Sequence, residues 1–103
     1  MDVKIYLITG TRKGLGKQLS ELYLARGHCV AGCSRGKESI DHPNYLHFEV
    51  DVADEKAVMN MVHSVKKVFG SIDFLINNAG IAAMNHLLTT PYKNARILFD
   101  TNF

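Results

Sequence analysis

Three glycines and three cations crowd the stretch TGTRKGLGKQL, residues 9–19. Gly10, Gly14 and Gly16 have no side chain, so the backbone N–H groups beside them can come close to a phosphate. The cations between them add positive charge that would attract one. The stretch therefore predicts a phosphate-binding turn, and its context must decide which kind of phosphate it holds.

A nucleoside triphosphate is excluded by the spacing of the motif. The triphosphate loop has the pattern G-x-x-x-x-G-K-[ST], in which the last hydroxyl holds magnesium. Gly16 and Lys17 match the central pair, but Thr11 stands in place of the first glycine and Gln18 in place of the hydroxyl. Two of the positions that carry the chemistry are therefore wrong.

A dinucleotide fits the position of the turn better. The glycines have the spacing G-x-x-x-G-x-G, and they lie between an apolar run at 3–9 and a stretch of helical periodicity at 15–26. In dinucleotide-binding folds, a glycine turn between the first strand and the first helix lets the pyrophosphate reach the helix N-terminus. A plain glycine-rich turn is the alternative, so a second signal is needed.

The end of the second strand supplies that signal. Dinucleotide folds carry an acid about 20 residues after the turn for NAD, or an arginine for the 2′-phosphate of NADP. Nineteen residues after the last glycine of the turn comes Arg35. Lys13 is a second cation for the phosphate, with Arg12 or Lys37 as further ones, and Glu38 is the nearest acid. Solvated surface cations are the alternative reading, but the arrangement favours NADP over NAD.

The apolar pattern alternates between strands and helices along the chain. Short apolar runs predict strands over residues 3–9, 28–34, 45–50 and 72–76. Helical spacing predicts helices over 15–26, over 54–69, and from Thr90 toward Phe103. Gly27 and Gly70 follow the first two helices as C-terminal glycines, and Asp54 places negative charge at the start of the second.

This alternation predicts an α/β fold with a doubly wound, Rossmann-like parallel sheet. Right-handed crossovers place helices on both faces of the sheet, and we expect the strand order 3-2-1-4. The polar stretch 36–44 is short for a helical crossover and is expected to be a loop. Because the last apolar stripe still lacks a partner at Phe103, we expect residues 1–103 to be the N-terminal part of one larger domain.

Composition argues against several other classes of protein. The formal net charge is only +2, so nucleic-acid binding would depend on a small basic patch without interleaved aromatics. Cys29 and Cys33 are four residues apart in a predicted strand, roughly 13 Å at strand rise, so they cannot bridge. The free thiols indicate a reducing compartment, and no cysteine–histidine spacing predicts a metal site. With no signal peptide or membrane span in the sequence, a cytoplasmic location is expected.

Four motifs together resemble a known family. TGTRKGLG at 9–16, DVAD at 51–54, NNAG at 77–80 and DTNF at 100–103 occur in the order and spacing of the short-chain dehydrogenase/reductases. The resemblance runs through nearly the whole chain and is closest to the compact single-domain branch. TGxxxGxG joined to NNAG at this separation is much more specific than either motif alone.

The resemblance implies a set of cofactor contacts. The three glycines would line the pyrophosphate, with Thr9 supporting the turn. Asp51 would accept a hydrogen bond from the adenine amino group, with a backbone contact from Val52 beside it, and Asn78 would tie the central strands together. The other implied cofactor contacts are Arg12, Lys13, Leu15, Ser34, Arg35, Asn77, Ala79 and Gly80.

The resemblance also implies an incomplete catalytic set. Asn102 is similar to the family's active-site asparagine, which helps hold a water near the catalytic lysine. The family's serine and its Tyr-x-x-x-Lys pair, in which the tyrosine is the general acid/base, come after that asparagine. Tyr92 and Arg96 form a Tyr-x-x-x-Arg pair, but they precede Asn102, and an arginine cannot relay a proton.

The expected function is therefore NADP(H)-dependent hydride transfer between nicotinamide and a small carbonyl or alcohol substrate. The resemblance implies a homo-oligomer, dimer or tetramer. The small net charge, the lack of a long apolar run and the spacing of cysteines and histidines indicate no nucleic-acid partner, no membrane partner and no metal. The alternative is a truncated, non-catalytic dinucleotide-binding fragment, because no Tyr-x-x-x-Lys occurs in residues 1–103.

Overall fold

The computed structural model describes residues 2–11, 14–37, 39–77 and 96–99. Strands and helices follow one another as β1 (Ile5–Thr9), α1 (Gly14–Ala25), β2 (Cys29–Ser34), β3 (Tyr45–Glu49), α2 (Glu55–Phe69), β4 (Phe74–Asn77) and β5 (Arg96–Phe99). The first six confirm the predicted order, with ends that differ by one or two residues from the predicted bounds. The described residues between β2 and β3 form neither helix nor strand, as expected of a loop.

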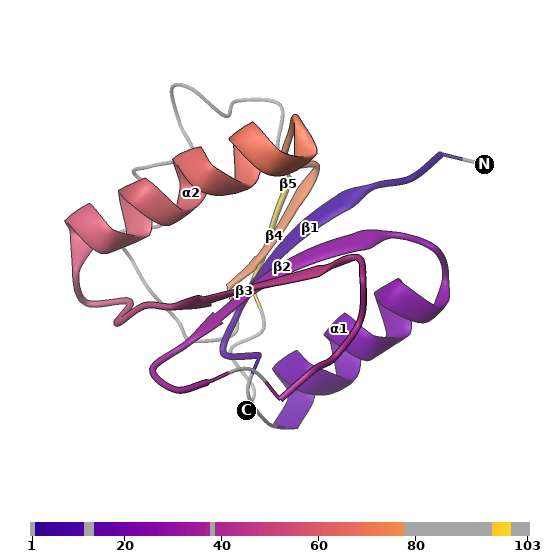
Figure 1. Cartoon of the computed structure of the whole chain (residues 1–103), viewed down its shortest axis with the longest axis horizontal. Coiled ribbons are helices and arrows are strands. Elements are labelled where there is room, and N and C mark those ends of the chain that lie inside the picture. Colours follow the sequence, from indigo (N-terminus) through magenta and orange to yellow (C-terminus); the bar gives the residue numbers. More distant parts are fainter. Residues whose placement is uncertain (1, 12–13, 38, 78–95, 100–103) are drawn as a thin grey trace.

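The strands form one parallel sheet in the order β3-β2-β1-β4-β5. The predicted order 3-2-1-4 is therefore confirmed, with one further strand beside β4. Figure 1 shows α1 on one side of this sheet and α2 on the other. Two helices on opposite faces of a parallel sheet make the described part of the chain a Rossmann-like α/β fold.

The prediction of a helix over the last residues is wrong where the structure can test it. Residues 96–99 form β5, which runs parallel to β4 with Phe74 opposite Arg96 and Asn77 opposite Phe99. A short apolar run suits a buried strand as well as a helix, and pairing satisfies backbone groups of β4 that would otherwise stand at an open edge. Thr90, and residues 100–103 with Asn102, lie outside the described residues.

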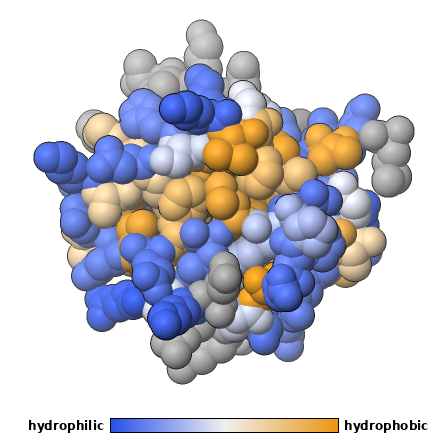
Figure 2. Space-filling model, viewed as in Figure 1, coloured by the Kyte–Doolittle hydropathy of each residue, from blue (hydrophilic) through white to orange (hydrophobic). Residues whose placement is uncertain are grey.

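Successive residues of β1 bury themselves on opposite faces of the sheet. One face packs against α2 in a cluster that includes Leu7, Leu75 and Val62, and the other packs against α1 around Ile8 and Val30. In Figure 2 apolar side chains gather in the middle of the visible face, with hydrophilic ones around them. The two-sided burial explains why β1 reads as a continuous apolar run.

Helix α2 begins and ends at the residues that the sequence indicated. Asp54 is its N-cap, and the carboxylate accepts a hydrogen bond from the N–H of Ala57 at 3.1 Å. Gly70 adopts the left-handed conformation with φ 88° and donates its N–H to the carbonyl of Lys66 at 2.8 Å. Gly27, after α1, has φ 90°. Capping therefore fixes where these helices end.

Removing the cap should weaken α2 measurably. We expect Asp54→Ala to lower the free energy of unfolding by about 1 kcal/mol, because the N–H of Ala57 loses its acceptor. Asp54→Asn keeps a side-chain oxygen and should lose at most a few tenths of that amount. Urea titrations followed by circular dichroism measure both. An equal loss in the two variants would show that charge, not the cap hydrogen bond, stabilises this end.

None of the helices in the described ranges is long and apolar enough to cross a membrane.

Candidate functional site

The candidate site lies where the strands at the centre of the sheet end. β1 is the point at which the strand order changes direction, and in open α/β sheets ligands bind outside the carboxyl ends of the strands at such a point. The turn after β1 is tied to the end of β2, because the N–H groups of Gly10 and Thr11 both donate to the carbonyl of Cys33, at 2.9 and 3.2 Å. This fixes the start of the glycine turn against the neighbouring strand.

The glycine turn has the backbone that only glycine adopts readily. Gly10 has φ 71° and Gly14 has φ 67°. A Cβ at Gly14 would have nothing within 4 Å, so space is open directly before the first turn of α1. Gly16 is buried in that turn, and its carbonyl accepts a hydrogen bond from the hydroxyl of Ser20 at 2.7 Å. Leu15, half-buried, lies between the two glycines.

The electrostatics of this helix end favour an anion. The first turn of α1 contains no acidic residue, so no carboxylate of that turn offsets the partial positive charge of the helix N-terminus. Open space, free backbone N–H groups and a positive helix end are what a pyrophosphate requires. Arg12 and Lys13, the cations of this turn, lie outside the described residues.

Thr9 and Asn77 hold the two central strands together at the site. The hydroxyl of Thr9 donates to Oδ1 of Asn77 at 3.1 Å, and both side chains are fully buried. The bond joins the ends of β1 and β4. Thr9 lies at the start of the glycine turn, so this bond anchors the turn to β4. Asn78, Ala79 and Gly80 lie outside the described residues, and the strand-joining role expected of Asn78 stays a prediction.

Arg35 and Asp51 come together beyond the ends of β2 and β3. Nη2 of Arg35 lies 3.5 Å from Oδ1 of Asp51, and the two side chains are 79% and 52% exposed. An ion pair this exposed contributes little to stability, so the guanidinium stays available to a ligand. Asp51 also accepts a hydrogen bond from the N–H of Ala53 at 2.9 Å, and Val52 packs against the apolar cluster under α2.

Ser34 shapes the turn that carries Arg35. Its hydroxyl donates to the carbonyl of Gly36 at 3.0 Å and accepts from the N–H of the same residue at 3.3 Å. The structure thus brings together the following predicted site residues: Thr9, Gly10, Gly14, Leu15, Gly16, Ser34, Arg35, Asp51, Val52 and Asn77. His47 contacts this turn at Ser34 and Gly36, and Tyr45 contacts His47. Neither residue was predicted as part of the site, because both read as ordinary strand residues.

Both cysteines are free thiols, and Cys33 is buried directly under the glycine turn. Burial raises the pKa of Cys33 from 9.0 to about 11, an effect that a hydrogen bond from the backbone of Gly10 partly offsets. A thiol that stays protonated is a poor nucleophile and a poor metal ligand. Cys33 is therefore a packing residue of the site and carries none of its chemistry.

The raised pKa of Cys33 predicts a loss of stability at alkaline pH. The unfolded thiol ionises near 9.0 and the folded one near 11, so the folded state holds the extra proton between these values. Stability contributed by the neutral thiol is then present below pH 9 and is lost as the pH rises toward 11. The full loss is about 3 kcal/mol at 1.36 kcal/mol per pKa unit.

Thermal unfolding from pH 8 to pH 11 measures this effect. Cys33→Ala should reduce the alkaline decline, to which the burial-raised pKa of Tyr6 also contributes, whereas Cys29→Ala, at a half-buried position in the same strand, should leave it unchanged. A decline of the same size in both variants would assign it to other groups.

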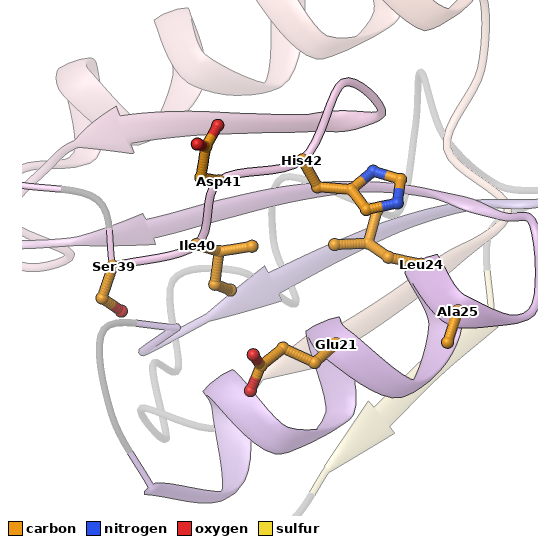
Figure 3. Close-up of a pocket in the computed structure, with 7 residues that line it drawn as sticks. All are labelled: Glu21, Leu24, Ala25, Ser39, Ile40, Asp41 and His42. Carbon is orange, nitrogen blue, oxygen red and sulfur yellow. The ribbon is translucent and has the colours of Figure 1, made fainter.

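A separate pocket of about 250 Å³ lies between α1 and the loop before β3. Figure 3 shows its lining, which includes the side chains of Glu21, Leu24 and His42. Of the candidate site residues that the structure describes, none lines it. Within the part of the chain that the structure describes, no group of three or more His, Cys, Asp and Glu side chains is placed to hold a metal ion.

Comparisons with known proteins agree with this geometry. A family model described as short chain dehydrogenase matches residues 4–103. The chain is 43% identical over 99 residues to an uncharacterized oxidoreductase of Schizosaccharomyces pombe, an alignment that covers 94% of this chain and 34% of the relative. It is 36% identical over 87 residues to the NADPH-dependent pterin aldehyde reductase of Arabidopsis thaliana, covering 77% of this chain and 36% of that one.

A solved structure shares the fold. The short-chain dehydrogenase of Burkholderia cenocepacia in complex with NADP superposes with a TM-score of 0.67 at 32% identity, covering 77% of this chain and 33% of that one. The chain spans about a third of the length of the curated relatives that it matches. Because the family model matches residues 4–103, nearly all of the sequence, the chain belongs to the short chain dehydrogenase family.

Proposed function

We propose that this chain binds the adenosine half and the pyrophosphate of NADP(H). We also propose that the protein to which it belongs transfers hydride between nicotinamide and a carbonyl or alcohol substrate. The observation that carries the proposal is the open space before α1, bounded by two glycines with positive φ, beside an exposed arginine at the end of β2.

The residues present fit the pyrophosphate. A side chain at Gly14 would occupy the space in front of the first turn of α1, and the glycine leaves it clear. Backbone N–H groups at that turn are the donors for the phosphate oxygens, and the uncompensated helix N-terminus supplies the field. Gly10 and Gly16 allow the backbone to approach, with Thr9 holding the turn to β4 through Asn77. Leu15, between Gly14 and Gly16, is the remaining residue of this turn that would lie beside the pyrophosphate.

The preference for NADP over NAD rests on the end of β2. The fold accepts either cofactor, and an arginine at this position suits the 2′-phosphate. Arg35 is largely exposed, and its Nη2 lies 3.5 Å from Oδ1 of Asp51. Ser34, beside it, would reach the same phosphate only by turning its hydroxyl away from the carbonyl of Gly36. The NADPH dependence of the Arabidopsis relative and the NADP in the Burkholderia structure support this preference.

Other cofactor contacts are proposed from the family pattern. Asp51 would meet the adenine beside Val52, and Lys13 and Arg12 would add charge near the phosphates. Asn77, Ala79 and Gly80 would flank the ribose, and Asn102 would serve as the active-site asparagine. When bound, the nicotinamide supplies the hydride chemistry.

A non-catalytic binding role is the second candidate. The observation in its favour is that residues 1–103 contain no Tyr-x-x-x-Lys pair, so this chain lacks the acid/base of the family. Both candidates predict dinucleotide binding, and they differ in turnover. For the whole protein we propose a cytoplasmic homo-oligomer that acts on a small molecule.

Thermal unfolding in the presence of NADPH, NADH or a short oligonucleotide tests the proposed function. A ligand that binds only the folded state raises the melting temperature by mass action. NADPH should raise it by several degrees, NADH by less, and the oligonucleotide not at all. Protection by NADH without protection by NADPH would contradict the assignment of Arg35, and protection by neither would contradict the function.

A further inference from the structure

A chain of hydrogen bonds runs beneath the candidate site from the glycine turn to the turn after β2. The hydroxyls of Thr11 and Tyr45 lie 2.7 Å apart, and the Tyr45 hydroxyl lies 2.8 Å from Nδ1 of His47. Nε2 of His47 lies 2.9 Å from the carbonyl of Gly36 and 3.2 Å from the hydroxyl of Ser34. Three side chains therefore connect the two turns that the cofactor would touch.

The hydrogen-bonding groups fix the direction of this chain when His47 is neutral. A carbonyl only accepts, so Nε2 must carry the proton that is donated to Gly36. Nδ1 is then the acceptor for the Tyr45 hydroxyl, whose oxygen in turn accepts from Thr11. In this network each donor thus faces an acceptor. A partly buried polar network orders the residues around it when its hydrogen bonds are satisfied in this way.

Gly32 makes room for this network. It lies opposite His47 in the pairing of β2 with β3. A Cβ at Gly32 would lie closer to the Tyr45 hydroxyl and the Thr11 side chain than real Cβ atoms approach anything, under 3.0 Å. Thr11 is fully buried and Tyr45 packs against the apolar cluster under α1, so neither side chain has much freedom to move away. Glycine in the middle of a strand weakens it, and the hydrogen bond that it permits accounts for its presence.

We propose that Tyr45 and His47 are positioning residues that set the preference for NADP(H) by holding the turn of Ser34, Arg35 and Gly36 against the glycine turn. The inference deepens the proposed function and rests on it. His47 contacts Ser34 and Gly36, the residues on either side of Arg35. Because these contacts order the turn before the cofactor binds, the guanidinium can contact the 2′-phosphate without the entropy cost of ordering the backbone during binding. NADH, which lacks the 2′-phosphate, gains nothing from it.

The test is the ratio of the dissociation constants for NADH and NADPH, measured by isothermal titration on the complete chain. His47→Leu removes both ring nitrogens and should weaken NADPH binding about tenfold, the equivalent of one or two lost hydrogen bonds, with less than a threefold change for NADH. His47→Gln keeps a donor at the reach of Nε2 and should recover most of the loss. His63→Leu, at an exposed histidine of α2, is the matched control and should leave the ratio unchanged.

Tyr45→Phe keeps the ring and removes only the hydroxyl, so it tests the network without risk to the fold. It should lower the ratio about threefold. General destabilisation would weaken both ligands together and leave the ratio unchanged. If the unmodified chain prefers NADPH and neither Tyr45→Phe nor His47→Leu lowers the ratio, the positioning inference is wrong and the proposed function stands. If the unmodified chain binds neither ligand, the proposed function itself fails and the inference fails with it.

Discussion

Arg35→Glu is expected to weaken the binding of NADPH by about 100-fold while changing the binding of NADH by less than threefold. A hydrogen bond to a charged partner contributes about 1.5–3 kcal/mol, and a carboxylate in place of the guanidinium adds repulsion from the 2′-phosphate. In the unmodified chain the Arg35 guanidinium lies 3.5 Å from Asp51. The variant replaces it with a second carboxylate beside Asp51, and the two negative charges together repel the phosphate. Isothermal titration with the two dinucleotides measures the effect.

Lys67→Glu is the control for Arg35→Glu. It makes the same change in net charge in the last turn of α2, at an exposed position. At physiological ionic strength, exposed charges beyond about 8 Å are largely screened, so this variant should bind NADPH almost as the unmodified chain does. Equal losses in the two variants would mean that only the overall charge attracts NADPH, and Arg35 would then have no specific role.

The second large effect concerns stability. Leu75→Ala should lower the free energy of unfolding by about 3 kcal/mol, because truncating a buried leucine loses transfer energy and leaves a cavity. Leu75 is fully buried in β4 and pairs with Leu7 of β1 in the cluster under α2. Domains of this size have a total stability of about 5–15 kcal/mol, so the variant would lose a large fraction of it.

Urea denaturation of Leu75→Ala beside Val68→Ala measures this loss. Val68 lies on α2 with 61% of its surface exposed, and its truncation should cost less than about 0.5 kcal/mol. A cost below 1 kcal/mol for Leu75→Ala would mean that the sheet does not pack on α2 as described.

Most of the fold could be predicted because its signals are local. The run at 3–9 is mostly apolar because β1 is covered on both faces, and Asp54 and Gly70 mark the ends of α2 by their own chemistry. β5 could not be predicted in the same way. Its four residues are too few to show a period, and their pairing with β4 is a tertiary contact.

The same distinction between local signals and tertiary contacts applies to the candidate site. Arg35 and Asp51 follow adjacent parallel strands, so their meeting at one edge follows from the strand order. The contact of Tyr45 with Thr11 depends instead on the register of β3 against β2 and on the gap left by Gly32. The sequence could have indicated that Tyr45 and His47 lie close together, because they are two residues apart and therefore share one face of the strand.

We propose above that this chain holds the adenosine end of NADP(H) through its 2′-phosphate. The most direct test is to titrate the chain with 2′,5′-ADP and with 5′-AMP, which differ only in that phosphate. We expect 2′,5′-ADP to bind at least about tenfold more tightly than 5′-AMP, and this difference in affinity to shrink as salt is added. Equal affinity for the two nucleotides, or no binding of either, would contradict the proposal.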